Sequence, residues 1–229
     1  MSSANVFSSK GEVAYAELRG RILSGALRPG SRLEQNELAG DLGMSLTPLR
    51  EAIRRLSSEG LIHLDAHRDA RVAGMSAAEA RQLFEVRLSL DPTAAMYAAQ
   101  RRTDDDLSAL RAAVARLLPV TREWGEEALT AHRAFHRALY VASHNATLIR
   151  LLDDIWDKTD RYRRAGLELP PGNEPRTRDH QEHRQLVDLV AARDEVGARA
   201  LMHSHIERSL LASAIEALEQ RERAGTAAG

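Results

Sequence analysis

The sequence contains no cysteine among its 229 residues. This absence excludes disulfide bonds, thiolate redox switches and zinc sites built on cysteine. A metal site in this chain would have to use histidine, aspartate, glutamate or water as ligands. The nine histidines are therefore the residues to place first.

Long apolar runs are also missing. No run approaches the roughly 18 residues of a membrane-spanning helix, and the start, MSSANVFSSKGE, lacks the apolar stretch of a signal peptide. We therefore expect a cytoplasmic protein with no membrane partner. Aromatic residues make up only 4% of the chain while Ala, Leu, Arg and Glu are plentiful, which favours helices. The net charge is -1, so a nucleic-acid surface would have to be a local patch.

The sequence pattern changes near RVAGMSAAEA, where a β-like stretch gives way to an Ala-rich helical pattern. This change predicts a small domain over residues 1–74 and a larger domain over residues 75–229, with a mobile C-terminal tail. In the first domain, one helix stops at SGALRPG and a short second helix covers EQNELAGDLG, with Gly43 as its C-cap. A third helix follows Ser45 as N-cap and ends at Gly60. LIHL and ARVAG predict two short strands.

Three helices followed by a small hairpin form the pattern of a winged helix-turn-helix. The outer face of the third helix would carry Thr47, Arg50, Glu51, Arg54 and Arg55. Side chains near the start of a recognition helix reach base edges, and arginines contact phosphates. The alternative is a solvated helix face with i,i+4 ion pairs. Residues 1–74 hold ten Lys and Arg against nine Asp and Glu, so DNA specificity would depend on placement and on a dimer that doubles the contacts.

The second domain is predicted to be an all-α bundle of six to seven helices. Six segments with helical apolar periodicity cover residues 76–101, 104–118, 126–143, 147–165, 176–193 and 195–220. The first segment begins with SAAE, a capping box, and the Pro-Pro-Gly sequence separates the fourth from the fifth. Bundles of this kind commonly place cofactor or metal sites in their cores.

Histidines recur on the inward stripes of this bundle. The segment AHRAFHRAL holds His132 and His136 one helical turn apart, the spacing by which one helix supplies two ligands to one ion. His183 begins an apolar stripe on the fifth helix, and His205 continues one on the sixth. Each buried imidazole needs a polar partner, and a shared metal would satisfy all four. The alternative is a histidine core held by hydrogen bonds without metal.

Arg87 lies on the first helix of the bundle, in LFEVRLSLD, between the apolar residues Leu83, Val86 and Leu90. An arginine beside an apolar stripe either extends its charged end to solvent or is directed at a carboxylate in a cavity. The residues alone leave both open.

The stretch AELRGRILSGALRPGSRLEQNELAGDLGMSLTPLREAIRRLSSEGLI closely resembles the winged helix-turn-helix of GntR-family bacterial transcription regulators. The specific pieces are ILSGALRPGSRL, ELAGDLGMS, TPLREAIRRL and EGLI. The all-α remainder resembles the FCD-type ligand-sensing domain of the FadR subfamily, so the likeness covers nearly the whole chain. The resemblance implies a homodimeric repressor or activator that binds a palindromic operator, and of the two we expect a repressor. A small carboxylic acid bound in the bundle would alter its DNA affinity.

The resemblance also implies roles for individual residues. The positions assigned to DNA contact are Asn36, Ser45, Thr47, Arg50, Arg54 and Arg68. The positions assigned to the acid are Arg87 and Asn145. Many FCD domains hold a divalent metal through an Asp-x-x-x-His pair and two later histidines, which match His136, His183 and His205. His132 stands at the Asp position, and four imidazoles without a carboxylate favour zinc or nickel over magnesium, calcium or manganese.

Two classes of function follow from these patterns. The main hypothesis is a ligand-responsive transcription factor that is not an enzyme. The rival hypothesis is a metalloenzyme whose histidine cluster activates water, although no clear general base accompanies the cluster in the sequence.

Overall fold

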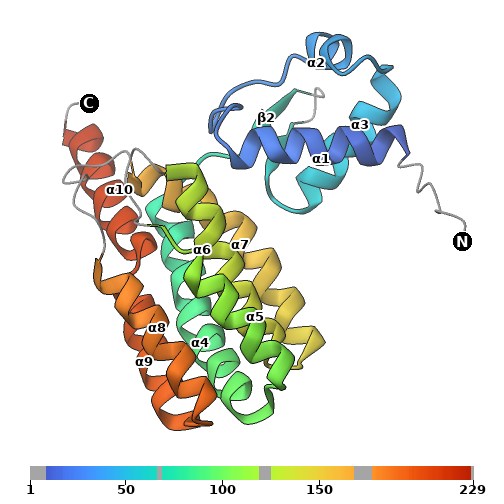
Figure 1. Cartoon of the computed structure of the whole chain (residues 1–229). Helices are drawn as coiled ribbons and strands as arrows, with labels where there is room; N and C mark the ends of the chain where they lie inside the picture. Colours follow the sequence, from blue (N-terminus) through green and yellow to red (C-terminus); the bar gives the residue numbers. More distant parts are fainter. Residues whose placement is uncertain (1–8, 66–68, 119–124, 168–176, 228–229) are drawn as a thin grey trace, which may run out of the picture. The chain divides into compact units, whose positions relative to one another are not determined.

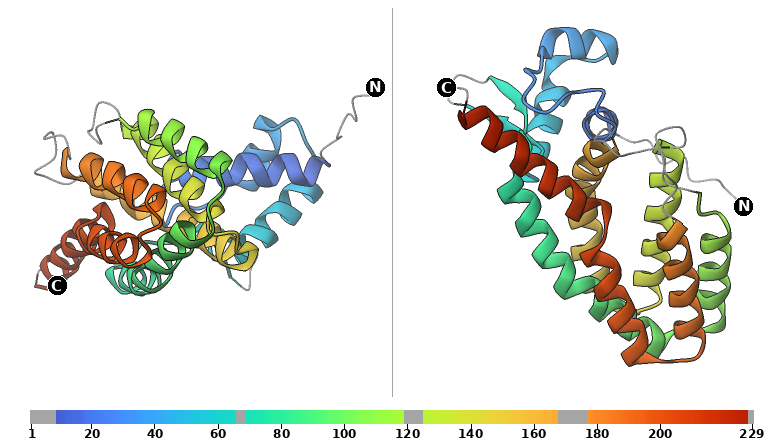
Figure 2. Two further views of the ribbon diagram at one scale, coloured as in Figure 1. Left: turned by 60° about the horizontal axis from the view of Figure 1, so that its bottom comes forward. Right: turned by 90° about the vertical axis from the view of Figure 1, so that its left-hand side faces the viewer.

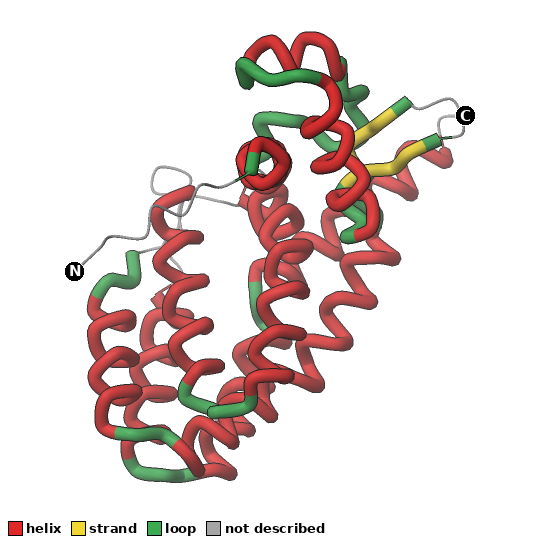
Figure 3. The backbone as a smooth tube through the Cα atoms, turned by 90° about the vertical axis from the view of Figure 1, so that its right-hand side faces the viewer, coloured by secondary structure: helices red, strands yellow, loops and turns green. Residues whose placement is uncertain are grey.

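The computed structural model of the chain describes residues 9–65, 69–118, 125–167 and 177–227. The chain divides into two compact units, Met1–Met75 and Ser76–Gly229 (Figure 1). Helices dominate both units, and two short strands complete the first (Figure 3). The predicted class, a winged helix-turn-helix followed by an all-α bundle, is confirmed. Among the described helices none is long and apolar enough to cross a membrane.

The N-terminal unit contains three helices and a hairpin. These are α1 (Lys10–Leu23), α2 (Gln35–Asp41), α3 (Leu46–Ser58), β1 (Ile62–Leu64) and β2 (Ala70–Val72). The strands pair antiparallel, with Ile62 opposite Val72 and Leu64 opposite Ala70. The apolar stripes of the helices and hairpin meet in one core that includes Leu18, Ile22, Leu38, Leu49, Ile53, Leu56 and Ile62. This core fixes α3 from one side and leaves its other side exposed.

Gly43 shapes the tight turn between α2 and α3. Its φ is 60, in the left-handed region that side chains with a Cβ rarely adopt. The Gly43 N–H donates to Gly40 O at 3.0 Å, and the Met44 N–H donates to Ala39 O at 3.0 Å. These two bonds satisfy the last carbonyls of α2 in the pattern of a Schellman motif. Gly43 thereby ends α2 as the sequence predicts.

Replacing Gly43 by Ala should destabilise the N-terminal unit by about 1–2 kcal/mol, because the added Cβ strains the left-handed backbone. No atom lies within 4 Å of the position such a Cβ would occupy, so a steric clash contributes nothing. The matched control is Gly20→Ala in α1, where the space is also open and the φ is not left-handed. Gly20→Ala should instead stabilise by about 0.5–1 kcal/mol. Denaturant unfolding of both variants measures the change in the free energy of unfolding. Equal changes for Gly43→Ala and Gly20→Ala would contradict this role of Gly43.

The C-terminal unit consists of helices only, within the described residues. They are α4 (Ala77–Arg101), α5 (Asp104–Ala115), α6 (Gly125–Val141), α7 (Ala146–Leu167), α8 (Thr177–Ala191), α9 (Glu195–Glu207) and α10 (Leu210–Ala227). Ser76 caps α4 through its side chain, which accepts from the Glu79 N–H at 3.1 Å. Thr103 and Asp106 form a full capping box at the start of α5. Ser76 thus marks a true helix start as predicted, but the capping box expected there is only half formed, because the Ser76 N–H donates to the Tyr162 hydroxyl instead of to Glu79.

One sequence prediction in this unit is wrong. The segment 195–220 was expected to be one helix, but it contains α9 and α10 with a break at Arg208 and Ser209. Arg208 leaves the helical region, with φ -107 and ψ 15, and its Nη2 donates to Glu182 on α8 at 2.8 Å. This tertiary contact accompanies a helix end that neither glycine nor proline marks in the sequence.

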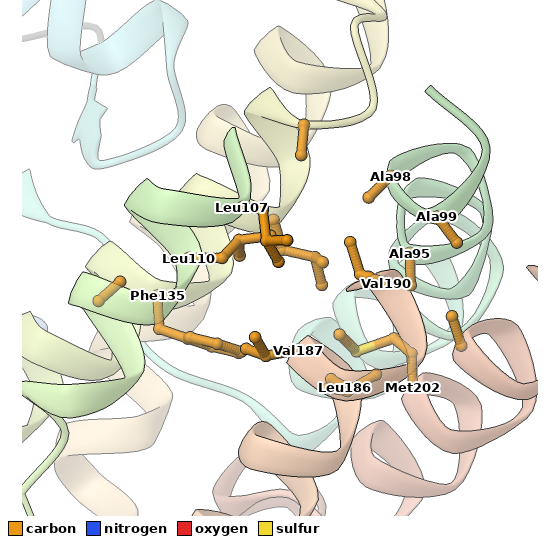
Figure 4. Close-up of a cluster of buried hydrophobic side chains, with 14 of the residues drawn as sticks. Ala95, Ala98, Ala99, Leu107, Leu110, Phe135, Leu186, Val187, Val190 and Met202 are labelled. Carbon is orange, nitrogen blue, oxygen red and sulfur yellow. The ribbon is translucent and has the colours of Figure 1, made fainter. Parts of the chain in front are cut away.

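Helix α4 is the centre of the bundle and contacts α6, α7, α8, α9 and α10. Its buried residues are mostly alanines, whose small side chains let the neighbouring helices approach closely. Figure 2 shows these long helices running side by side. Their largest apolar cluster includes Phe135, Leu110, Val187 and Met202 (Figure 4). The buried polar side chains lie on the same helices.

Candidate functional site

The exposed face of α3 carries side chains predicted to contact DNA. Thr47, Arg50 and Arg54 are exposed and follow an i, i+3, i+7 spacing, which puts them on one side of the helix. Leu49 and Ile53 are buried on the other side. The helix is therefore held by its apolar side while its polar side faces solvent.

Further predicted DNA-contacting residues flank this face. Ser45 is the exposed N-cap residue of α3, and its side chain makes no capping hydrogen bond. Asn36 is exposed on α2. The Arg50 Nε donates to Gln35 Oε1 at 3.2 Å, which ties the arginine to α2. Arg68 lies outside the described residues.

Arg55, which the sequence placed on the same outer face, is engaged within the N-terminal unit. Its guanidinium lies 3.7 Å from the centroid of the Tyr15 ring, and its Nε lies 3.4 Å from Glu59 Oε1. The Tyr15 hydroxyl donates to the same carboxylate at 2.9 Å. These contacts link α1 to α3 and give Arg55 a structural role.

Four histidines from three helices meet inside the C-terminal unit. His132 and His136 come from α6, His183 from α8 and His205 from α9, and all four are buried. The ring centroids of His132 and His136 lie 4.5 Å apart, and those of His183 and His205 lie 4.6 Å apart. Each ring offers one nitrogen, and these four nitrogens all lie within 4.8 Å of one another. The structure thus brings together the four histidines that the sequence singled out.

Burial keeps three of these rings neutral. It lowers the pKa of His132, His136 and His183 well below the usual histidine value, and neighbouring positive charges lower it further. A neutral imidazole has a lone pair on one ring nitrogen, and this is the form that binds a metal.

Glu182 on α8 fixes the orientation of His205. Its Oε2 lies 2.8 Å from His205 Nδ1, and its Oε1 accepts from Arg208 Nη2 at 2.8 Å. Burial would raise the pKa of Glu182, but these hydrogen bonds and charges lower it to about 2. The carboxylate therefore keeps a proton on Nδ1 and leaves Nε2 available to a metal. Glu182 was not among the predicted site residues, because its only signal in the sequence was an acidic residue next to a predicted ligand.

The Nε2 atoms of His136 and His183 face each other at 3.2 Å. Two nitrogen ligands of a tetrahedral zinc ion, each about 2.0–2.1 Å from the metal, lie about 3.3–3.4 Å apart. The observed separation fits two ligands of one ion. The same separation also allows an N–H···N hydrogen bond if one ring carries its proton on Nε2.

Arg87 belongs to a buried polar network beside the cluster. Its Nε donates to Asp91 Oδ2 at 2.8 Å, and its guanidinium lies 4.4 Å from the centroid of the Trp156 ring. Asp91 also accepts from the Tyr140 hydroxyl, which lies 3.5 Å from His136 Nδ1. The Arg87 side chain is 2% exposed, so it does not extend to solvent. Its Nη2 is buried and has no hydrogen-bond partner among the described residues.

A second buried guanidinium, Arg163 on α7, lies against His132. Its Nη2 is 3.0 Å from His132 Nδ1, and its Nη1 donates to Asp160 Oδ1 at 3.0 Å. It lies 4.8 Å from the centroid of the Trp156 ring. Arg163 was not among the predicted site residues. The i, i+4, i+7 spacing of Trp156, Asp160 and Arg163 was the available signal, because it puts them on one helix face.

Comparisons with known proteins decide the family. Residues 10–72 match the bacterial regulatory proteins of the gntR family, and residues 82–208 match the FCD domain. The chain belongs to the GntR family. As a GntR-family protein with an FCD domain, it is a DNA-binding transcription regulator.

Relatives of this GntR-family chain are regulators as well. It is 31% identical over 185 residues to the Nta operon transcriptional regulator of Aminobacter aminovorans, across 79% of this chain and 83% of that protein. It is 27% identical over 198 residues to the repressor GlaR of Escherichia coli (strain K12), across 84% and 90%. The solved structure of E. coli McbR/YncC shares the fold, with a TM-score of 0.75 at 24% identity, over 94% of this chain and 100% of that one.

The acid-binding positions that the GntR-family resemblance implies lie in different surroundings. Arg87 lies beside the histidine cluster, as described above. Asn145 directly precedes α7, where its Oδ1 accepts from the Leu148 N–H at 3.1 Å. Asn145 comes after the last residue of α6, Val141, and that helix end is itself more than one turn beyond His136. Its carbonyl oxygen is used as a helix cap, so its role in acid binding stays a prediction.

Proposed function

We propose that this GntR-family regulator represses transcription as a homodimer on a palindromic operator, and that a metal and a small carboxylic acid at the histidine cluster control its DNA affinity. The observation that carries the proposal is the combination of four buried histidines with a buried guanidinium nitrogen on Arg87 that has no hydrogen-bond partner in the described part of the chain. Such a site is costly to build without a ligand, because each buried polar group needs a partner.

The DNA side of the proposal rests on α3. An exposed face with Thr47, Arg50 and Arg54 suits the major groove, where arginine recognises guanine with two hydrogen bonds. One α3 reads only a few bases, and the small positive charge of residues 1–74 adds little nonspecific affinity. Two copies on two half-sites would double the contacts, which is why we propose a homodimer and a palindrome.

The metal side rests on the donor set. Neutral imidazoles suit zinc and nickel, whereas magnesium and calcium prefer oxygen ligands. His136, His183 and His205 would hold the ion, with His132 beside them. A metal-bound histidine usually makes a hydrogen bond with the ring nitrogen that does not bind the metal. His205 has such a hydrogen bond, from Nδ1 to the carboxylate of Glu182. When bound, the metal would act as a Lewis acid and coordinate a carboxylate oxygen of the effector.

The effector side rests on charge. An ion held by imidazoles keeps its positive charge, since no protein carboxylate is among the proposed ligands. Arg87 is already paired with Asp91 through Nε, and its Nη2, which has no partner within the described ranges, can donate to a further oxygen. A small anion with oxygen donors would satisfy both the metal and this nitrogen. Binding would then bias the dimer between two arrangements that differ in operator fit.

Replacing Arg50 by Ala should weaken operator binding about 10- to 100-fold, because a well-placed arginine–base contact contributes about 1–3 kcal/mol. The dissociation constant is measured by fluorescence anisotropy at two salt concentrations, with the intergenic DNA that lies upstream of the gene for this protein. The control is Arg111→Ala, an exposed arginine on α5 in the C-terminal unit. Equal affinity of the Arg50 variant and wild type would refute α3 as the recognition helix.

The full chain, purified without a histidine tag, should contain about one zinc or nickel ion per chain by elemental analysis. Removing the ion with a chelator should lower the melting temperature, because a ligand that binds only the folded state stabilises it. His136→Gln should abolish both the metal content and the chelator effect, whereas His203→Gln, an exposed position on α9, should change neither. A metal-free protein that chelator leaves unchanged would favour the hydrogen-bonded histidine core.

Replacing Arg87 by Lys should remove the response to acids while keeping the metal. Lysine retains the charge opposite Asp91 but lacks the planar fork that reaches a second acceptor. A thermal-shift screen of the metal-loaded chain with hydroxy acids, sugar acids and dicarboxylates should give stabilising compounds for wild type. The same compounds should give a smaller shift, or none, with Arg87→Lys. Undiminished shifts in the variant would exclude Arg87 from the acid site.

A further inference from the structure

The contact between Arg163 and His132 bears on how many histidines can bind the metal. The Arg163 guanidinium is 2% exposed, and its Nη2 lies 3.0 Å from His132 Nδ1. Burial lowers the pKa of Arg163 to about 10, although Asp160 opposes this shift. A guanidinium carries N–H donors and is not deprotonated in proteins, so His132 faces a buried positive charge at 3.0 Å.

The hydrogen-bond chemistry of this contact has one consistent arrangement. A guanidinium has donors and no acceptor, so His132 Nδ1 must accept, and the neutral ring then carries its proton on Nε2. A metal at Nδ1 would need the lone pair that Arg163 uses. A metal at Nε2 would require the proton to move to Nδ1, where it would point at the Arg163 N–H. Either mode of coordination therefore breaks the Arg163 contact.

Arg163 is held firmly in its position. Its other terminal nitrogen, Nη1, donates to Asp160 at 3.0 Å, and Trp156 packs against the guanidinium. A buried charged donor that loses its acceptor carries an uncompensated desolvation penalty. Movement of Arg163 away from His132 would therefore leave the buried Nη2 donor of a charged group without its acceptor, although Nη1 could keep its bond to Asp160.

The other three histidines meet no such obstacle. His205 is oriented by Glu182, which leaves its Nε2 available to an ion. His136 and His183 direct their Nε2 atoms at each other across 3.2 Å. His183 also makes a hydrogen bond to the backbone of Asp179. These rings can bind an ion without losing a bond to a cation.

We infer that the metal is held by three histidines, His136, His183 and His205, and that Arg163 keeps His132 out of the coordination shell. This inference rests on the metal site proposed above and changes its ligand set. Arg163 is a positioning residue, because it acts on the metal through His132. A three-histidine site leaves the metal with open positions for an exogenous oxygen ligand, whereas four histidines would fill a tetrahedral shell.

The identity of residue 132 decides this outcome. A carboxylate has two oxygens, so an aspartate could accept from Arg163 with one and bind the metal with the other. An imidazole has a single lone pair in its neutral form and cannot do both. Glutamine at this position could accept from Arg163 through its carbonyl and would leave the three-histidine site in place.

Cobalt(II) titration of the full chain tests the inference with the metal alone. The competition Kd against a chelator and the visible absorption spectrum are measured for wild type, His132→Gln, His132→Asp and His136→Gln. We expect His132→Gln to bind cobalt within about threefold of wild type and with the same spectrum. His136→Gln should bind on the order of 100-fold more weakly, and His132→Asp should bind about 10-fold or more tightly than wild type.

Two results would overturn the inference in different ways. If His132→Gln loses as much affinity as His136→Gln, His132 is a ligand and Arg163 does not exclude it, while the metal site stands. If neither wild type nor His132→Asp binds cobalt, the metal site itself is absent and the inference fails with it. Near-ultraviolet circular dichroism of each variant shows whether the fold is intact, and His203→Gln provides the matched surface control.

Discussion

Desolvation of positive and polar side chains is the constraint that organises the C-terminal unit. Its interior holds four imidazoles and the guanidinium groups of Arg87 and Arg163. Each of these arginines has a buried carboxylate within reach, Asp91 in one case and Asp160 in the other. A buried charge without such a partner would cost several kcal/mol. Each pair joins residues one turn apart on the same helix, so α4 and α7 each bring the compensating carboxylate into the core together with the arginine.

The apolar core and the polar site are built from consecutive residues. Phe135 packs in the apolar cluster while the next residue, His136, lies in the histidine cluster, and the two clusters touch where the rings of Phe135 and His183 lie 4.7 Å apart. Successive residues on a helix point about 100° apart, so one helix can serve both. A rigid apolar core next to the cluster holds the imidazoles in place, which is what a site for a small ligand requires.

The sequence was sufficient for the fold class and for the residues of the histidine cluster, because both depend on local periodicity. Helical spacing puts His132 and His136 on one face, and cap residues mark helix starts. The partners of the histidines lie on other helices, and periodicity does not specify contacts between helices, so Glu182 and Arg163 were missed. Asp91 was missed although its i,i+4 spacing from Arg87 is visible in the sequence. The break between α9 and α10 was missed for a related reason, since a contact of Arg208 with another helix accompanies it and no glycine or proline marks it.

The central claim is that buried imidazoles of this unit bind one metal ion. X-ray absorption at the zinc edge, on the full chain loaded with one equivalent of zinc, tests this most directly because it reports the ligand atoms themselves. The account predicts about three imidazole nitrogens at roughly 2.0–2.1 Å, with the remaining positions filled by oxygen. A shell of oxygen atoms alone, without the scattering pattern of imidazole rings, would contradict it.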